Sequence, residues 1–252
     1  MELLLISLAS LFAGFVDSIV GGGGLILVPA LFAAFPAAAP ATLFGTNKSA
    51  SVWGTAVATV QFSRRVSIPW RVLAPAALTA LAGALLGAWS VTRVHGDALR
   101  KLLPLILLAL LVYTLVRKDL GRQHAPRLAG HAEALAASGI ALALGFYDGF
   151  FGPGTGSFLI FIFVRWLGYD FLHASASAKL LNMMTNIGAL LLFALKGHIW
   201  WRYAAVMAVA NISGSLLGTR LALKHGVGFV RGMFIAVVTA LILKTAYDAF
   251  WR

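Results

Sequence analysis

Residues 14–24 read GFVDSIVGGGG, a stretch that places four consecutive glycines inside a long apolar run. This stretch decides the fold. As one straight helix, residues 3–35 would be about 50 Å long at 1.5 Å per residue. The hydrocarbon core of a bilayer is only about 30 Å thick. We therefore expect the helix to break at residues 21–24, where glycine tolerates backbone angles that other residues avoid.

The same pattern recurs 131 residues later, where residues 145–156 read GFYDGFFGPGTG. At this offset, and without a single gap, Asp17 aligns with Asp148 and Lys48 aligns with Lys179. Leucine and alanine would match by chance in so apolar a chain, but its few acids and lysines would not. The sequence therefore predicts two tandem homologous halves.

The composition is that of a membrane protein. Of the 252 residues, 60% are hydrophobic and 11% are charged, whereas soluble domains have roughly 25% charged residues. The apolar runs are continuous rather than alternating, which favours helices over a barrel. The net charge of +12 comes mainly from short connectors, where lysine and arginine meet anionic lipid, so we expect no nucleic-acid partner. The chain has no cysteine, and we expect no metal and no cofactor.

Apolar runs and breaks predict an all-α polytopic protein with four hydrophobic segments in each half. Residues 1–116 form the first half, residues 117–131 a polar linker, and residues 132–252 the second half. The segments of the first half are expected at 3–18 with 25–35, 42–62, 70–92 and 97–116. Those of the second are expected at 133–151 with 157–168, 174–195, 200–221 and 227–250.

The glycine-broken segments leave two topologies open. If each crosses the membrane once, the halves are parallel; if each re-enters and returns, the halves are inverted. The distribution of lysine and arginine is compatible with either topology, in opposite orientations. The short second arms, 25–35 and 157–168, favour re-entrance because runs of that length rarely span a bilayer.

Four charged residues lie within apolar segments: Asp17, Asp148, Lys48 and Lys179. An ionised side chain at the centre of a lone membrane helix costs about 2.5–3.5 kcal/mol. These residues must therefore be paired, be neutralised or line a polar cavity. Two interpretations follow. The pairs lock segments together, or the lysines line an anion pathway while the aspartates carry protons.

Polar groups beside the lysines and the glycine breaks complete the candidate site. Lys179, Asn182 and Asn186 lie on one helix face by their spacing, and a helix that restarts after glycine offers backbone N–H groups to an anion. The substrate-binding candidates are Thr46, Asn47, Lys48, Lys179, Asn182, Asn186, Gly22, Gly23, Gly24, Gly154, Thr155 and Gly156, and the proton-coupling or ion-pair candidates are Asp17 and Asp148. No catalytic residue is expected.

These motifs resemble those of the sulfite exporter TauE/SafE family. The resemblance is carried by residues 14–24 followed by Val28-Pro29, by GTNK at 45–48, by residues 145–156, and by AKLLN at 178–182. It implies a multi-pass permease of the bacterial inner membrane with about eight segments, linked to sulfite, sulfoacetate or related organosulfur anions. The second break departs from the first, because Pro153 and Thr155 replace Gly22 and Gly24.

We therefore expect a secondary transporter of a small anion such as sulfite or an organosulfonate, coupled to an ion gradient. A passive anion channel is the alternative. A membrane-embedded enzyme is disfavoured because the sequence has no His-Glu-x-x-His and no Gly-x-Ser-x-Gly motif. The expected partners are the anion and the lipid bilayer, and a homodimer is left open.

Overall fold

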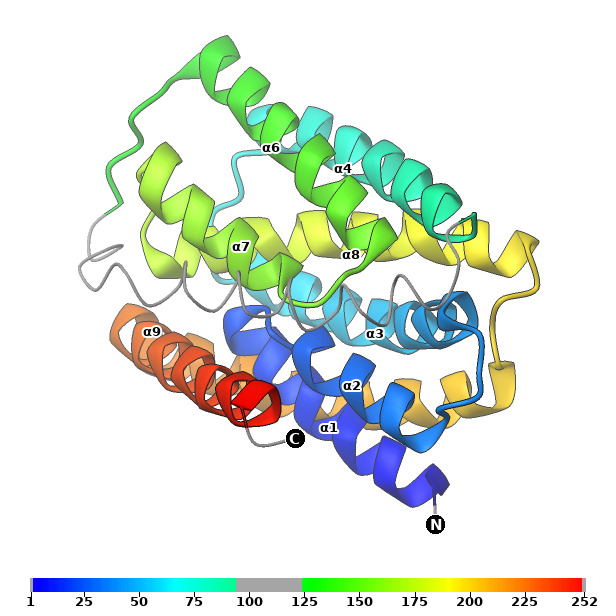
Figure 1. The fold of residues 1–252 in the computed structure, drawn as a ribbon. Coiled ribbons are helices and arrows are strands. Elements are labelled where there is room, and N and C mark those ends of the chain that lie inside the picture. The colour runs from blue at the N-terminus through cyan, green and yellow to red at the C-terminus, as the bar shows by residue number, and fades with distance from the viewer. Residues whose placement is uncertain (1, 94–123, 251–252) are drawn as a thin grey trace.

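The computed structural model describes residues 2–93 and 124–250, and every regular element in these ranges is helical (Figure 1). The all-α prediction is therefore confirmed for the described residues. The predicted segment at 97–116 and the first part of the predicted linker lie outside them. The elements are α1 (Glu2–Val20), α2 (Gly24–Ala34), α3 (Pro40–Ser63), α4 (Trp70–Val91), α6 (Gly130–Phe150), α7 (Thr155–Ile162), the π-helical turn η1 (Phe163–Leu167), α8 (Phe171–Leu195) and α9 (Trp201–Phe250).

Four of the helical segments are long and apolar enough to cross a membrane. By length and composition they are α1, α4, α8 and the first part of α9, Trp201–Gly226. Gly226, with φ of +69° and ψ of −158°, breaks α9 between the two segments expected at 200–221 and 227–250. Large apolar side chains such as Leu78, Leu135 and Leu195 are exposed on the outside of the bundle, as lipid-facing residues would be. The chain is a multi-pass membrane protein.

The first helical hairpin is made by α1 and α2. The chain turns at Gly21, whose φ is +78°, and α2 folds back on α1 so closely that a β-carbon at Gly23 would lie 2.8 Å from the Ala13 carbonyl oxygen. The end of α2 also packs against the start of α9, because the Phe35 ring lies 5.0 Å from the Trp200 ring. Near the middle of α1, the Ser10 hydroxyl donates to the Met207 carbonyl near the start of α9. Both arms therefore extend toward the same end of the bundle.

Helices α3 and α8 run antiparallel. Near the start of α3, the Thr46 hydroxyl oxygen accepts a hydrogen bond from the Trp200 backbone N–H, just beyond the end of α8. Just beyond the end of α3, Ser67 lies 3.4 Å from the imidazole of His173 at the start of α8. We call these two ends of the bundle the Thr46 end and the His173 end.

The second hairpin, α6 with α7 and η1, opens toward the His173 end. At its base the Tyr169 hydroxyl donates to Glu133 at 2.5 Å, and the Arg127 backbone N–H donates to the Leu167 carbonyl. Since Phe35 packs on Trp200, the first hairpin opens toward the Thr46 end. The two hairpins therefore enter the bundle from opposite ends, as the arrangement of α1–α2 and α6–α7 in Figure 1 also shows.

Glycines bring α4 against α6 and α1 against α9. A β-carbon at Gly83 on α4 would lie 2.3 Å from the Leu142 carbonyl oxygen, and one at Gly214 on α9 would lie 1.9 Å from that of Leu11. Gly214 and Leu142 lie 131 residues after Gly83 and Leu11, respectively, so the two contacts involve equivalent positions of the predicted halves. Small residues at membrane helix interfaces let backbones approach this closely, so these helices are held by backbone-to-backbone packing.

We expect Gly149→Ala to destabilise the bundle and Gly139→Ala on the same helix to be tolerated. A methyl group at Gly149 would lie 2.0 Å from the Ala84 carbonyl oxygen, whereas one at Gly139 would meet nothing within 4 Å. Overpacking of this kind costs about 1–3 kcal/mol, while alanine for glycine in an open helix gains up to about 1 kcal/mol. Thermal unfolding of both variants in detergent tests this contrast. Equal melting temperatures would contradict the close α4–α6 contact.

Candidate functional site

The two hairpin turns meet at the centre of the bundle. The Ser157 backbone N–H donates to the Gly21 carbonyl at 3.1 Å, and the Ser157 hydroxyl donates to the Val20 carbonyl at 2.8 Å. A β-carbon at Gly156 would lie 2.5 Å from the Gly21 α-carbon. The start of α7 is thus joined directly to the turn after α1, with no room for a side chain between the backbones.

Around this junction the buried charges pair crosswise between the two predicted halves. The Lys48 ammonium lies 2.5 Å from the Asp148 carboxylate, and both side chains are almost inaccessible. Lys179, which is completely buried, lies 3.7 Å from the Asp17 carboxylate and also donates to the Asp17 backbone carbonyl. Each lysine therefore pairs with the aspartate of the other half, an arrangement that the sequence did not specify.

The Asp17 carboxylate also occupies the start of a helix. It accepts a hydrogen bond of 3.1 Å from the Gly23 backbone N–H, at the N-terminal end of α2. Free N–H groups and the positive end of the helix dipole make this position favourable for an anion. A carboxylate of the protein itself thus holds the place that the sequence analysis assigned to a bound anion.

Polar side chains from α3 and α8 line the same region. Asn47, Ser51 and Thr55 follow one another at four-residue intervals on α3, so they share one face of the helix. From the other side, the Asn186 amide donates to the Thr55 hydroxyl oxygen at 3.3 Å. These groups supply both donors and acceptors beside the lysines.

The groups enclose a small polar cavity of about 20 Å³. A volume of this size holds about one water molecule, so the ion pairs fill most of the space between the hairpin turns. The cavity is lined by Asp17, Gly21, Gly24, Asn47, Lys48, Ser51, Thr55, Asp148, Gly152, Gly154, Thr155, Gly156, Asn182 and Asn186.

Most of the substrate-binding candidates come together here, and some lie elsewhere. Thr46 lies outside the cavity, at the end of the bundle that is named after it, where its hydroxyl oxygen accepts a hydrogen bond from the Trp200 backbone N–H. Lys179, Gly22 and Gly23 are not among the residues that line the cavity. Four lining residues were missed by sequence reasoning: Gly21, Ser51, Thr55 and Gly152. The four-residue spacing from Asn47 to Ser51 and Thr55 was a usable signal.

A separate cluster of titratable groups lies at the His173 end. The Asp170 carboxylate caps α8 by accepting from the backbone N–H groups of Leu172 and His173, both at 2.8 Å, and it lies 2.7 Å from the His173 ring nitrogen. Burial, followed by the proximity of His173, lowers the pKa of His124. These contacts make the cluster a helix cap, because both oxygens of Asp170 already have partners.

A multi-pass bundle with paired buried charges at the meeting point of two broken helices is typical of membrane transporters. The sequence comparisons agree with this class: residues 6–245 match the model of the family described as "Sulfite exporter TauE/SafE". The chain belongs to this family.

The most similar relatives include three proteins that are named as membrane transporters. The chain is 41% identical to "Probable membrane transporter protein YfcA" of Escherichia coli (strain K12), over 95% of this chain and 88% of that protein. It is 37% identical to "Probable membrane transporter protein ORF9" of Sinorhizobium sp, over 95% and 90%. It is 33% identical to a protein of Haemophilus influenzae with the same general name, over 95% and 92%. No solved structure matches the chain significantly.

Proposed function

We propose that this membrane transporter carries a small oxyanion, of the sulfite or organosulfonate type, through the polar centre between the two hairpin turns. The single observation that carries the proposal is the pairing of Lys48 with Asp148, together with that of Lys179 with Asp17. In each pair a carboxylate lies against the cation that an incoming anion would use. The Asn47 and Asn182 amides and the N–H groups at the starts of α2 and α7 complete a set of donors suited to oxyanions.

Competition between the carboxylate and the substrate provides a mechanism for proton coupling. When Asp148 takes up a proton its charge is lost, and the Lys48 ammonium is free to bind the anion. When the anion leaves, Asp148 releases its proton and pairs with Lys48 again. Proton and anion then move in the same direction, and the same exchange is available to Lys179 with Asp17. A passive channel has no such requirement, because its flux follows the electrochemical gradient alone.

We further propose that residues 1–116 and 132–252 are inverted repeats whose glycine-broken hairpins re-enter the membrane from opposite sides. The antiparallel course of α3 and α8 and the opposite openings of the two hairpins support this topology over a parallel one. Inverted repeats with broken helices at the centre allow alternating access, because the two halves can exchange conformations around a fixed site.

The positive-inside rule then gives an orientation in a bacterial inner membrane. Among the connectors and helix ends of the described ranges, more cations lie at the His173 end than at the Thr46 end, so the His173 end is proposed to be cytoplasmic. The cations at the His173 end are Arg64, Arg65, Arg71, Arg127, Arg165, Arg220 and Lys224, and those at the Thr46 end are Arg93, Lys196 and Arg202.

Flux measurements in proteoliposomes test the proposal. We expect purified protein to take up sulfite or a small sulfonate, and uptake to accelerate at least severalfold when the outside is more acidic, because protonation of Asp17 and Asp148 releases the lysines. Asp17→Asn is expected to keep Lys179 free at every pH and so to weaken the response to the pH gradient, which the Asp148–Lys48 pair alone then supplies. Lys48→Ala and Lys179→Ala are each expected to reduce flux to background.

Lys196→Ala is the matched control, since Lys196 is exposed at the Thr46 end, and it should transport like the native chain. Undiminished flux in both Lys48→Ala and Lys179→Ala would refute the anion pathway. Flux that ignores the pH gradient in both the native chain and Asp17→Asn would leave the passive channel as the better description.

A further inference from the structure

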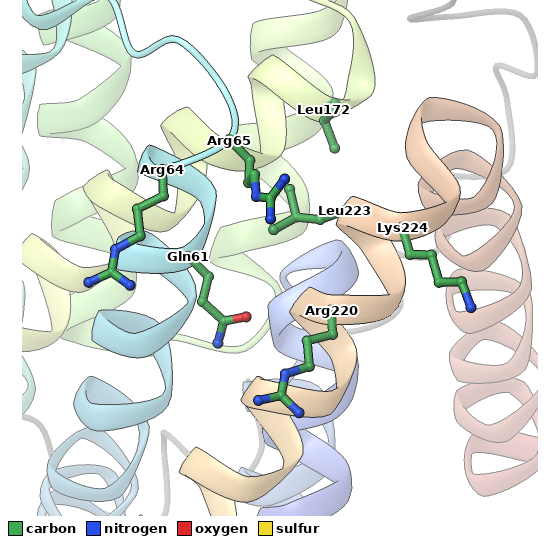
Figure 2. A pocket seen from close by; sticks show the side chains of 7 residues that line it. All are labelled: Gln61, Arg64, Arg65, Leu172, Arg220, Leu223 and Lys224. Atoms are coloured by element: carbon green, nitrogen blue, oxygen red, sulfur yellow. The ribbon is translucent and has the colours of Figure 1, made fainter.

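A second, larger pocket lies at the His173 end, away from the central cavity. It has a volume of about 570 Å³ and opens between the end of α3, the start of α8 and the part of α9 before Gly226 (Figure 2). This volume is within the range of about 300–1,000 Å³ that is typical of small-molecule sites. The pocket, which we call the basic pocket, is lined by Gln61, Arg64, Arg65, Leu172, Arg220, Leu223 and Lys224.

The basic pocket is strongly cationic. Of its polar lining residues, four carry a positive charge, and none of these four forms an ion pair with a carboxylate among the side chains that the structure describes. Cations gathered around one cavity repel one another unless an anion lies between them. The two leucines give the pocket an apolar wall. Its chemistry therefore suits a ligand with an oxyanion head and an organic body.

Gln61 gives an independent indication of a ligand. Its amide nitrogen is buried and has no hydrogen-bond partner within the described part of the chain. Figure 2 shows the Gln61 side chain extending from α3 into the space that faces α9, with Arg220 on the other side of that space. A buried donor without a partner costs about 1–3 kcal/mol, and an oxyanion between Gln61 and Arg220 would satisfy it.

Neither helix-end electrostatics nor the sequence duplication explains the whole pocket. Arg64 and Arg65 follow the C-terminal end of α3, and Lys224 lies in the last turn before the break at Gly226, where cations are favoured anyway. Arg220 lies further from a helix end, and Gln61 carries no charge. At the positions 131 residues away, Gln61 and Arg64 correspond to Leu192 and Leu195, and Arg220 corresponds to Trp89. Arg65 and Lys224 correspond to the cations Lys196 and Arg93, so the donors present in one half of the sequence only are Gln61, Arg64 and Arg220.

We propose that the basic pocket binds an oxyanion group of the sulfonate or phosphate type at the His173 end of the protein. Gln61 and Lys48 are both on α3, 13 residues apart, which places the pocket about 20 Å along the helix from the central charges. The site is thus distinct from the transport centre, and binding there does not depend on the proposed transport mechanism. The oxyanion belongs either to a soluble anion or to the phosphate of a lipid headgroup.

Binding measurements on purified protein test this site without any flux. In detergent at low ionic strength, isothermal titration with sulfate and with inorganic phosphate is compared for the native chain, Arg64→Gln/Arg220→Gln and Gln61→Leu. In nanodiscs, retention of phosphatidylglycerol relative to phosphatidylcholine is compared for the same proteins. We expect the double variant to bind at least one probe about tenfold or more weakly, and Gln61→Leu to bind that probe severalfold more weakly.

Lys196→Gln/Arg202→Gln is the control, because it removes two exposed cations from the Thr46 end, and its affinities should stay within twofold of the native values. Selective loss of sulfate or phosphate binding would identify a soluble anion, and selective loss of phosphatidylglycerol a lipid headgroup. The proposal is overturned if both pocket variants bind every probe as the native chain does. It is equally overturned if the control loses as much affinity as the double variant.

Discussion

Lys48→Met and Asp148→Asn are each expected to destabilise the protein by about 3–5 kcal/mol, and Lys48→Met is expected to stop anion flux. Removing one member of a buried ion pair leaves the other charge without compensation in a medium of low polarity, and this is the usual size of the penalty. Both side chains of the pair are only a few per cent exposed, so solvent cannot replace the lost partner. Thermal unfolding in detergent and flux in proteoliposomes measure the two effects separately.

The double variant Lys48→Met/Asp148→Asn distinguishes a functional pair from a structural lock. With both charges gone no buried ion remains uncompensated, so much of the lost stability is expected to return. Anion flux is expected to stay at background, because the cation that would bind the substrate is absent. If the double variant recovered transport as well as stability, the pair would serve only to hold α3 against α6.

Gly21→Ala is expected to separate the two hairpins and to cost about 2–5 kcal/mol. Two effects add. Alanine at a positive φ of 78° costs about 1–2 kcal/mol, and its β-carbon would lie 2.3 Å from a backbone atom of Gly156, an overpacking cost of about 1–3 kcal/mol. Because the Ser157 N–H to Gly21 hydrogen bond depends on the same contact, flux is expected to fall with stability.

Two further glycine variants separate these effects. Gly197 has a φ of +72° but nothing within 4 Å of its position for a β-carbon, so Gly197→Ala should show the backbone cost alone. Gly156 is helical and crowded, since a β-carbon there would lie 2.7 Å from the Gly21 carbonyl oxygen, so Gly156→Ala should show the crowding cost alone. Melting temperatures of Gly21→Ala and Gly197→Ala that agree would mean that the two turns do not meet closely.

Much of the fold follows from the sequence because membrane helices are long and their breaks are marked by glycine. The helix expected at 42–62 is observed at Pro40–Ser63, and the one at 70–92 at Trp70–Val91. The breaks lie at residues 21–23 and 151–154, within or beside the glycine runs. The short second arms favoured re-entrant hairpins and inverted halves, but the contacts that fix their direction, such as Phe35 with Trp200, could not be predicted because they join residues far apart in the sequence.

The buried charges were predictable individually, but their pairing was not. A charged residue in an apolar segment must find a partner, so Asp17, Lys48, Asp148 and Lys179 were identifiable individually. The choice between pairing within a half and pairing across halves depends on which helices cross at the centre. The uncharged lining residues Ser51 and Thr55 were harder to find, because hydroxyl groups in membrane helices usually bond to their own backbone.

The crosswise pairing also determines when during its synthesis the protein can become complete. Asp17 and its partner Lys179 are separated by 162 residues, and a ribosome adding about 5–20 residues per second needs about 8–30 s to cover that distance. Until then the Asp17 carboxylate lacks the cation that it contacts in the complete protein, at a cost of about 2.5–3.5 kcal/mol if it is ionised in lipid without another partner. The newly made first hairpin is therefore expected to pair Asp17 with another group, such as Lys48, or to remain outside the lipid, until the second half of the chain arrives.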